Sequence, residues 1–271
     1  MIGDLHLHTC ISDGSMQPEH LVEYAIKTKL DYIAITDHDS MDGVHSAQLA
    51  ANGNINVIAG VEVSTFDYKN NKRVHLLCYE PKRTDELLAF CNRTISNREK
   101  ATTEMINIIA TKYPIDVETV KRYAKNSSCL YKQHICIALM NMGYTSTVMG
   151  ELFKELFSKS GWARVDIKYE ETREIIELLK ASGGVCVLAH PGVYNNFDII
   201  DDLCEKGLDG IEVWHPRQNE QDTEKALQKA IQKGLIKTGG SDFHGAYSKK
   251  ANTIGSRVTP ENELIKLISK I

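Results

Sequence analysis

The chain has 271 residues, of which 42% are hydrophobic and 25% are charged, and its formal net charge at pH 7 is −4. This length and apolar content allow one substantial hydrophobic core, or one domain that carries an insertion. The slightly acidic balance excludes the broad polycationic surface that holds long nucleic acid by counterion release. We therefore expect no binding of long duplexes, whereas a small phosphorylated substrate remains compatible with the composition.

The cysteines and the N-terminus bear on the cellular compartment. The chain has seven cysteines, which form neither a CxxC pair nor a compact disulfide framework, and free thiols are typical of a reducing compartment. The N-terminus enters an apolar run at Ile2 without a preceding basic region, and no later run approaches membrane-spanning length. The sequence thus predicts a cytoplasmic protein with no membrane partner.

Short β-rich runs alternate with helical patterns at both ends of the chain, which is typical of a parallel sheet or an α/β barrel. The helices expected between strands show apolar residues at three- and four-residue spacing over 18–29, 170–182, 198–206 and 218–233. Gly183, Gly207 and Gly234 follow such helices, where glycine readily forms a left-handed cap. The seven predicted strands are 2–7, 32–36, 57–63, 74–79, 185–189, 210–214 and 236–240.

The middle of the chain has a different pattern. From 81 to 168 no segment reads as a strand, and helical periodicity is found over 94–112, 117–125, 133–142 and 148–157. We interpret residues 1–80 and 169–271 as one barrel domain and residues 81–168 as a helical insertion that covers the substrate.

Imidazole and carboxylate side chains gather at the ends of the predicted strands. His6 and His8 lie two residues apart on the first strand, so both point to one face, and Asp242 and His244 repeat this spacing after the last strand. The carboxyl ends of parallel strands share one edge, so these groups should converge. The candidate metal ligands are His6, His8, Asp13, His38, Glu62, His75, His190, Asp242 and His244.

Each of these residues also has a structural interpretation. A single His-x-His pair is a weak metal signal, His190 could be satisfied by backbone at a turn, and Asp39 is better explained as the cap of a following helix, a role that Ser40 could share. The coincidence of so many ionisable groups favours a metal, because such groups need an opposing charge when they are buried together. Nine candidates exceed the needs of one ion and suit two or three divalent cations.

The motifs resemble those of the polymerase and histidinol phosphatase (PHP) family, and the resemblance covers nearly the whole chain. Within the family, the insertion and the run that ends at Pro191 are similar to the branch of the 3′,5′-nucleoside bisphosphate phosphatases and 5′-to-3′ exoribonucleases. The motifs are Asp4-Leu-His-Leu-His-Thr9, Ser12-Asp-Gly14, Ile35-Thr-Asp-His-Asp39, Gly60-Val-Glu62, Val74-His75, Ala189-His-Pro191 and Gly240-Ser-Asp-Phe-His244.

The resemblance implies a distorted seven-stranded (β/α)7 barrel with a helical insertion and a site for three metals. Because the candidate ligands are nitrogen and oxygen donors, manganese, iron or zinc is expected. A hydroxide that bridges the metals would attack phosphorus, so no side-chain nucleophile is required and no general acid is assigned. The ligand sets implied are His6, His8, Glu62 and Asp242 for one ion, Glu62, His75 and His190 for a second, and Asp13, His38 and His244 for the third.

The helical insertion departs from its relatives in the segment that begins at Tyr131. Related enzymes commonly have an arginine where this chain has Lys132, and a second arginine where it has Ile137. A lysine cannot form a bidentate contact with phosphate, so the phosphate subsite is expected to be weakened or rearranged. We predict substrate contacts for Lys132, His134 and Arg98. Packing between helices is an equal alternative for His134, and a solvated helix charge is the alternative for Arg98.

The function predicted is metal-dependent hydrolysis of a phosphate ester in a nucleotide or short oligoribonucleotide of the 3′,5′-bisphosphate type. Two alternatives within this class are a cyclic phosphodiesterase and a histidinol phosphate phosphatase. From other classes, the chain could be a noncatalytic module associated with a polymerase, which the complete ligand set disfavours. It could also be a metal-dependent amide hydrolase, which is disfavoured because no lysine stands at a strand end as a bridging carbamate.

Overall fold

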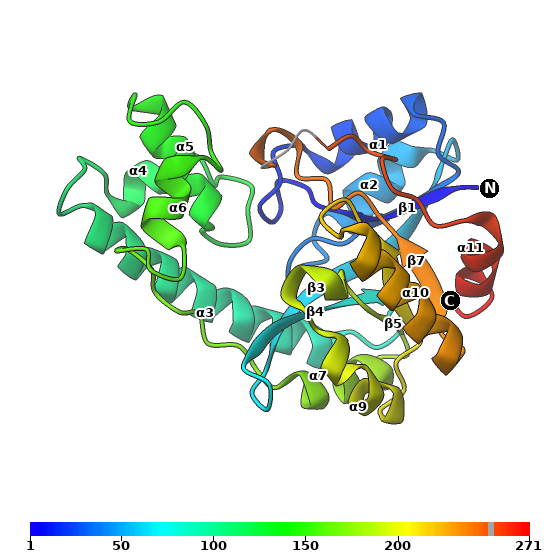
Figure 1. The fold of residues 1–271 in the computed structure, drawn as a ribbon. Coiled ribbons are helices and arrows are strands. Elements are labelled where there is room, and N and C mark those ends of the chain that lie inside the picture. The colour runs from blue at the N-terminus through cyan, green and yellow to red at the C-terminus, as the bar shows by residue number, and fades with distance from the viewer. Residues whose placement is uncertain (249–251) are drawn as a thin grey trace.

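The computed structural model describes residues 1–248 and 252–271. Its centre is a seven-stranded sheet in the order β1 to β7, and the first and last strands meet where the His8 amide donates a 3.0 Å hydrogen bond to the Phe243 carbonyl. The sheet is thereby nearly closed into a barrel, as predicted (Figure 1). The strands are β1 (Gly3–Leu7), β2 (Tyr32–Ile35), β3 (Asn56–Asp67), β4 (Lys72–Tyr79), β5 (Val185–Leu188), β6 (Gly210–Trp214) and β7 (Ile236–Gly239).

The fourth strand runs against the others. β4 pairs antiparallel with both β3 and β5, whereas the remaining neighbours in the sheet are parallel. The expectation of a fully parallel sheet is therefore wrong for β4, which follows β3 through a short turn rather than through a helical crossover. The reversal has a useful consequence, because His75 near the start of β4 reaches the same edge as residues at the ends of the parallel strands.

Inward-facing side chains of the barrel divide into two layers. Along β4 the residues His75, Leu77 and Tyr79 share one face, as the two-residue period of a strand requires. Leu77 and Tyr79 belong to an apolar cluster that fills the barrel and includes Leu5 of β1, and the Tyr79 hydroxyl donates a 2.8 Å hydrogen bond to the Leu5 carbonyl. This cluster is the apolar floor of the barrel. It supports a second layer of polar side chains, which includes His75 and is called the polar layer below.

Helices cover the outside of the barrel, and the sequence analysis gave no residue range for three of them, although it expected a helix after Ser40. Gly183, Gly207 and Gly234 have φ values of 81°, 93° and 64°, which confirms that they end helices. The missed helices are α2, which has a weak apolar face, the single turn α8, and the C-terminal α11. The helices around the barrel are α1 (Pro18–Lys27), α2 (Val44–Ala51), α7 (Thr172–Ala181), α8 (Pro191–Tyr194), α9 (Ile200–Glu205), α10 (Glu220–Lys233) and α11 (Glu261–Ile268).

The insertion begins with one long helix, α3 (Asp85–Ile109), which starts nine residues before the predicted segment. Its first turns place Leu87 and Phe90 in a barrel cluster, and its last turns place Met105 in a separate apolar cluster of the insertion. Figure 1 shows α3 connecting the barrel to the other helices of the insertion. These are α4 (Val117–Lys121), α5 (Lys132–Asn141) and α6 (Glu151–Phe157).

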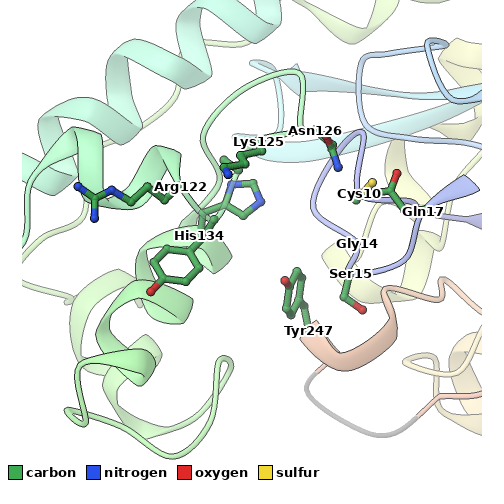
Figure 2. Close-up of a pocket in the computed structure, with 11 residues that line it drawn as sticks. Cys10, Gly14, Ser15, Gln17, Arg122, Lys125, Asn126, His134 and Tyr247 are labelled. Carbon is green, nitrogen blue, oxygen red and sulfur yellow. The ribbon is translucent and has the colours of Figure 1, made fainter.

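The insertion and the barrel face each other across a cavity of about 230 Å³. Figure 2 shows His134 and Lys125 on the insertion side, opposite Ser15 and Tyr247 of the barrel. Across the described ranges, no helix combines the length and apolar character needed to cross a membrane.

Candidate metal centre

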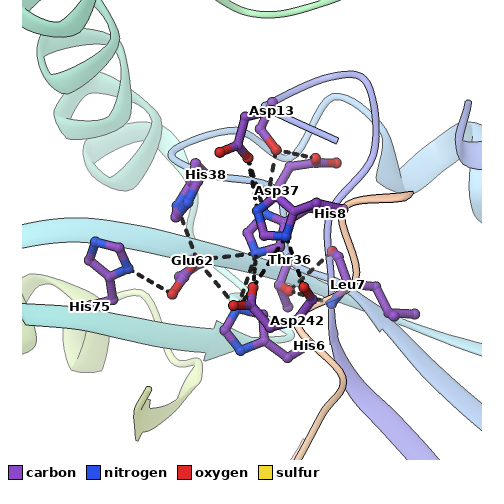
Figure 3. Close-up of polar contacts among 12 residues, drawn as sticks. His6, Leu7, His8, Asp13, Thr36, Asp37, His38, Glu62, His75 and Asp242 are labelled. Atoms are coloured by element: carbon purple, nitrogen blue, oxygen red, sulfur yellow. Dashed lines mark hydrogen bonds and ion pairs between the residues drawn. The ribbon is translucent and has the colours of Figure 1, made fainter. Parts of the chain in front are cut away.

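The carboxylate of Glu62 on β3 lies at the centre of the polar layer (Figure 3). The Nε2 atoms of His6 and His8 lie 3.3 and 3.2 Å from Oε2, and His38 Nδ1 lies 3.0 Å from the same oxygen. The other oxygen, Oε1, is 2.9 Å from His75 Nδ1 and 2.8 Å from the Nε2 of His190. Five imidazoles from different parts of the barrel thus converge on one carboxylate, as expected of a bridging ligand.

Two aspartates extend this arrangement along β1 and the loop that follows β7. Asp242 Oδ1 lies 3.3 Å from His8 Nε2 and 3.5 Å from His244 Nδ1. Asp13 Oδ1 lies 3.2 Å from His244 Nε2 and 3.9 Å from His8 Nδ1. The structure therefore brings all nine predicted ligands together. Among the predicted ligands, the groups whose donor atoms lie within 4.8 Å of one another are His8, Asp13, His38 and His244; His6, His8 and Asp242; His6, Glu62 and His190; and His38, Glu62 and His75.

Two of these residues adopt a backbone conformation that is unusual for non-glycine residues. His190 and Asp242 have φ values of 27° and 48°. Such conformations cost about 1–3 kcal/mol each and persist where the surrounding structure enforces them, often at functional sites. His190 is the second residue after β5 and Asp242 the third after β7, where the turn of the chain directs each side chain into the polar layer.

Two further motif carboxylates hold the loops rather than joining the centre. Asp37 accepts hydrogen bonds from the Thr9 amide and the Ser12 hydroxyl at 2.7 and 2.6 Å, so it fixes the loop after β1. Asp4 accepts from the Ser241 amide at 2.9 Å, which ties β1 to the loop after β7. Burial raises the pKa of Asp4 to about 6, although the hydrogen bonds that it accepts act in the opposite direction and lower the pKa. The motif residues therefore position the candidate ligands as well as supply them.

The electrostatics of the cluster favour ionised carboxylates but divide its imidazoles into two groups. Burial lowers the pKa of His6 and His8, but the neighbouring carboxylates raise it further, so these two rings are protonated and would release a proton when a cation binds. Burial opposes ionisation of Glu62, but the surrounding histidines, led by His38 and His6, hold its pKa well below the ordinary value. Burial also lowers the pKa of His38 and of His75, which keeps these imidazoles neutral. Ionised carboxylates and neutral imidazoles are the forms that coordinate cations.

The donor set fits divalent metal ions. Asp13 Oδ1 and His38 Nδ1 are buried, and their contacts with His244 and Glu62 are close enough for ion pairs but lack hydrogen-bond geometry. The Nε2 atoms of His6 and His8 lie only 3.1 Å apart and face the same carboxylate oxygen. Cations would satisfy these atoms, and imidazole with carboxylate suits manganese, iron or zinc better than thiolate-selected metals.

The sequence analysis missed Glu212 of β6 and left His215 unassigned. Glu212 Oε1 lies 3.0 Å from His6 Nδ1, and Glu212 Oε2 accepts a 2.8 Å hydrogen bond from the His190 amide. His215 Nε2 lies 3.1 Å from Asp242 Oδ2. His215 directly follows the predicted strand 210–214, so the rule that found the other ligands could have found it, whereas Glu212 lies in the middle of that strand. When the carboxylate of Glu212 accepts a hydrogen bond from Nδ1–H of His6, the proton of the neutral ring is on Nδ1, so Nε2 is free to bind a metal.

Replacing Glu212 should weaken metal binding more than it disturbs the fold. In the Glu212→Gln variant we expect metal affinity to fall by about 10- to 100-fold, because the imidazole of His6 loses the carboxylate that orients it. Metal content after dialysis against graded metal buffers measures this effect. The exposed Glu205→Gln variant is the matched control and should retain its metal. Equal metal affinity in both variants would contradict the positioning role of Glu212.

Asp39 and Arg98 form a buried pair that links the barrel to the insertion. Arg98 Nη2 donates to Asp39 Oδ2 at 2.7 Å and to the Ser64 hydroxyl at 2.9 Å, and its guanidinium stacks on the Tyr131 ring. The helix-cap interpretation of Asp39 is wrong, because α2 begins only at Val44 and Asp39 instead binds Ser64 and Arg98. The solvated-charge alternative for Arg98 is also wrong, since its side chain is buried. Substrate contact by Arg98 stays a prediction.

Lys132 and His134 lie at the start of α5, on the side of the insertion that faces the barrel. His134 lines the cavity of Figure 2, and its Nδ1 accepts a hydrogen bond from the Tyr131 amide at 3.2 Å. Burial lowers the pKa of His134 to about 4, so the ring is neutral and carries its proton on Nε2. Beside it, Gln133 donates a 2.6 Å hydrogen bond to Asp13, which connects α5 to the candidate centre.

Comparisons with known proteins cover most of the chain. The PHP domain model matches residues 4–185. A phosphoribosyl 1,2-cyclic phosphate 1,2-diphosphodiesterase of Eggerthella lenta is 34% identical over 261 residues, which is 95% of this chain and 99% of the relative. A 5′-3′ exoribonuclease of Escherichia coli is 28% identical over 254 residues, or 90% of this chain and 85% of the relative.

A solved structure has the same fold over nearly the whole chain. It is a Bifidobacterium adolescentis protein assigned as a metal-dependent phosphoesterase, with a TM-score of 0.92 at 28% identity over 99% of this chain and 96% of that one. These relatives confirm the predicted enzyme class, a metal-dependent phosphoesterase, and the predicted barrel. The domain match, with the nearly closed seven-stranded sheet and the nine convergent candidate ligands, places this chain in the PHP family.

Proposed function

We propose that the chain hydrolyses a phosphate ester in a small ribonucleotide, a ribose phosphate or a short oligoribonucleotide. The observation that carries this proposal is the convergence of five histidines on Glu62, with the insertion tied to the same cluster by the hydrogen bond from Gln133 to Asp13. A buried cluster of imidazoles and carboxylates is suited to hold cations against a phosphoryl group.

We further propose that two or three divalent ions, manganese, iron or zinc, are held at this centre. When bound, such cations lower the pKa of water and neutralise charge on phosphoryl oxygens. The residues that would hold them are the nine predicted from sequence, His6, His8, Asp13, His38, Glu62, His75, His190, Asp242 and His244, with His215 as a further candidate.

The insertion would act as a lid that orients the substrate. His134 carries a proton on Nε2 and lines the cavity, so it can donate a hydrogen bond to a substrate oxygen. Gln133 fixes the start of α5 to Asp13 and thereby sets the height of the lid above the centre. Arg122 and Lys125 also line the cavity and favour an anionic substrate there. The division into barrel residues 1–80 and 169–271 and insertion residues 81–168 belongs to this proposal.

A second candidate function is hydrolysis of a cyclic ribose phosphate. It is favoured by the relative from Eggerthella lenta, which aligns with 95% of this chain at 34% identity and is named for that activity. Both candidate reactions use the same centre. They differ in whether a phosphodiester or a phosphomonoester fits between the centre and the lid.

A phosphate-release screen with manganese tests the proposal. The substrates are adenosine 3′,5′-bisphosphate, ribose 1,2-cyclic phosphate 5-phosphate, histidinol phosphate and a short oligoribonucleotide, and product analysis separates monoester from diester cleavage. We expect turnover of at least one substrate that EDTA abolishes and manganese restores. Hydrolysis by protein shown to be metal-free by elemental analysis would overturn the proposal.

We also propose a reducing, cytoplasmic location. The support is that all seven cysteines are free. Thiols in oxidising compartments more commonly form disulfides.

A further inference from the structure

The insertion does not contact all the candidate ligands equally. Asp13, His38 and His244, whose donor atoms lie within 4.8 Å of one another and of His8, are each joined to it directly or through a neighbouring residue. We call these three residues the third-ion set. Among the described residues, the other six candidate ligands form no hydrogen bond or ion pair with residues 81–168. The insertion can therefore act directly on one part of the centre only.

Gln133 of α5 holds one carboxylate oxygen of Asp13. Its Nε2 donates a 2.6 Å hydrogen bond to Asp13 Oδ2, while the other oxygen, Oδ1, lies 3.2 Å from His244 Nε2. Asp13 lies in the turn after β1, beyond the end of that strand at Leu7, so the hydrogen bonds of the sheet do not fix its position. A partner that fixes one oxygen of a carboxylate orients the other oxygen toward a cation.

The segment that leads into α5 binds the backbone of the same turn. The Ser128 amide donates a 2.7 Å hydrogen bond to the Ile11 carbonyl. The Ser127 hydroxyl donates a 2.6 Å hydrogen bond to the Ser12 carbonyl. Figure 2 shows the loop between α4 and α5 next to this turn. The insertion thus forms hydrogen bonds with three consecutive residues, 11 to 13, and holds the turn that carries the Asp13 ligand.

Two tyrosines join the other members of the third-ion set to the insertion. The Tyr131 hydroxyl donates a 3.3 Å hydrogen bond to the His38 carbonyl, and the two rings stack with their centres 6.3 Å apart. Tyr247 ends the short 3₁₀ helix Gly245–Tyr247 that directly follows His244, and its side chain packs against the apolar cluster of the insertion. Displacement of the insertion would therefore change the surroundings of all three ligands together.

We propose that docking of the insertion completes the site of the ion held by the third-ion set, and that Gln133 is the positioning residue of that site. This inference rests on the proposed function and adds that the insertion controls the affinity of one metal ion. Such coupling is reciprocal, so an ion that binds more tightly when the insertion is docked also strengthens docking by the same factor. The ligand sets that share Glu62 without Asp13 should keep their affinity when the contact with Gln133 is lost.

Manganese binding by Gln133→Leu tests the positioning role. The variant removes the amide donor and keeps a side chain of similar size, so Asp13 Oδ2 loses its partner. In graded manganese buffers, elemental analysis should show that one equivalent needs about tenfold more free manganese than in the wild type, as for loss of a hydrogen bond to a charged ligand. The affinity of the remaining equivalents should not change. The matched control is Gln228→Leu, because Gln228 Nε2 donates a 2.7 Å hydrogen bond to the exposed carboxylate of Glu224.

Hydrogen exchange of the wild-type protein measures the reverse coupling. Saturating manganese should slow amide exchange over residues 127–134 by about tenfold, because the Ser128 amide is protected only while it binds the turn after β1. Exchange over α10, residues 220–233, should be the same with and without manganese. In Gln133→Leu the protection that manganese gives to residues 127–134 should be smaller than in the wild type.

Three results would overturn the coupling while leaving the proposed function intact. The first is a manganese titration of Gln133→Leu that coincides with that of Gln228→Leu. The second is an equal loss of affinity for every equivalent of metal in Gln133→Leu. The third is exchange over residues 127–134 that manganese does not change in the wild type. A wild-type protein that binds no divalent metal would overturn the proposed function and the coupling with it.

Discussion

Substitution of Glu62 by alanine should remove both bound metal and activity. The carboxylate contacts five imidazoles at 2.8–3.3 Å, so without it the histidines lose the negative charge that they share. We expect kcat to fall by at least about 10³-fold, which corresponds to several kcal/mol of transition-state stabilisation from metal ions. Elemental analysis of the purified variant should show that at least one equivalent of metal is lost.

Two comparisons make the Glu62→Ala result specific. Glu118→Ala removes an exposed carboxylate of α4 and should retain metal and activity, apart from a small effect of its surface pair with Lys121. Circular dichroism should show the same helical content in both variants, because the apolar floor of the barrel does not include Glu62. Full metal content and full activity in Glu62→Ala would remove the bridging assignment.

Removing the cation from the buried pair of Arg98 and Asp39 should destabilise the protein more than removing the cation from an exposed ion pair. Both side chains are at most 5% exposed, and the guanidinium joins α3 to the loop after β2. Arg98→Met leaves the carboxylate of Asp39 buried without its cation, so we expect the free energy of unfolding to fall by about 3–5 kcal/mol. Urea denaturation measures the difference.

An exposed pair on the same helix provides the control for Arg98→Met. Arg93 pairs with Glu170 at 2.8 Å, but its side chain is 53% exposed, so Arg93→Met should cost less than about 1 kcal/mol. In the double variant Arg98→Met with Asp39→Asn, part of the loss should be recovered because the buried charge is also removed. A loss in Arg98→Met no larger than that in Arg93→Met would show that the pair does not hold the insertion to the barrel.

Local patterns in the sequence predicted the strands and the candidate ligands. The strands are short apolar runs with clear ends, and their two-residue period places His6 and His8 on one face of β1 whatever surrounds them. Gly183, Gly207 and Gly234 likewise ended helices because of their own backbone freedom. These features depend on neighbours within a few residues, so they can be read from the chain itself.

Contacts between distant segments could not be predicted in this way. The reversal of β4, the pairing of Arg98 with Asp39 and the hydrogen bond from His190 to Glu212 each depend on how the barrel closes. Asp39 illustrates the difference. Its residue type and its place after a strand suit a helix cap, and only the packing of α3 against the barrel brings Arg98 to it.

The sequence by itself thus determined the number of strands, the set of nine candidate ligands and the resemblance to the PHP family. The tertiary structure alone decided that β4 reverses, that Glu212 contacts His6 and His190, and that His215 contacts Asp242. The physical reason is that strand periodicity is a local property, whereas burial and charge pairing are set by segments that the fold brings together.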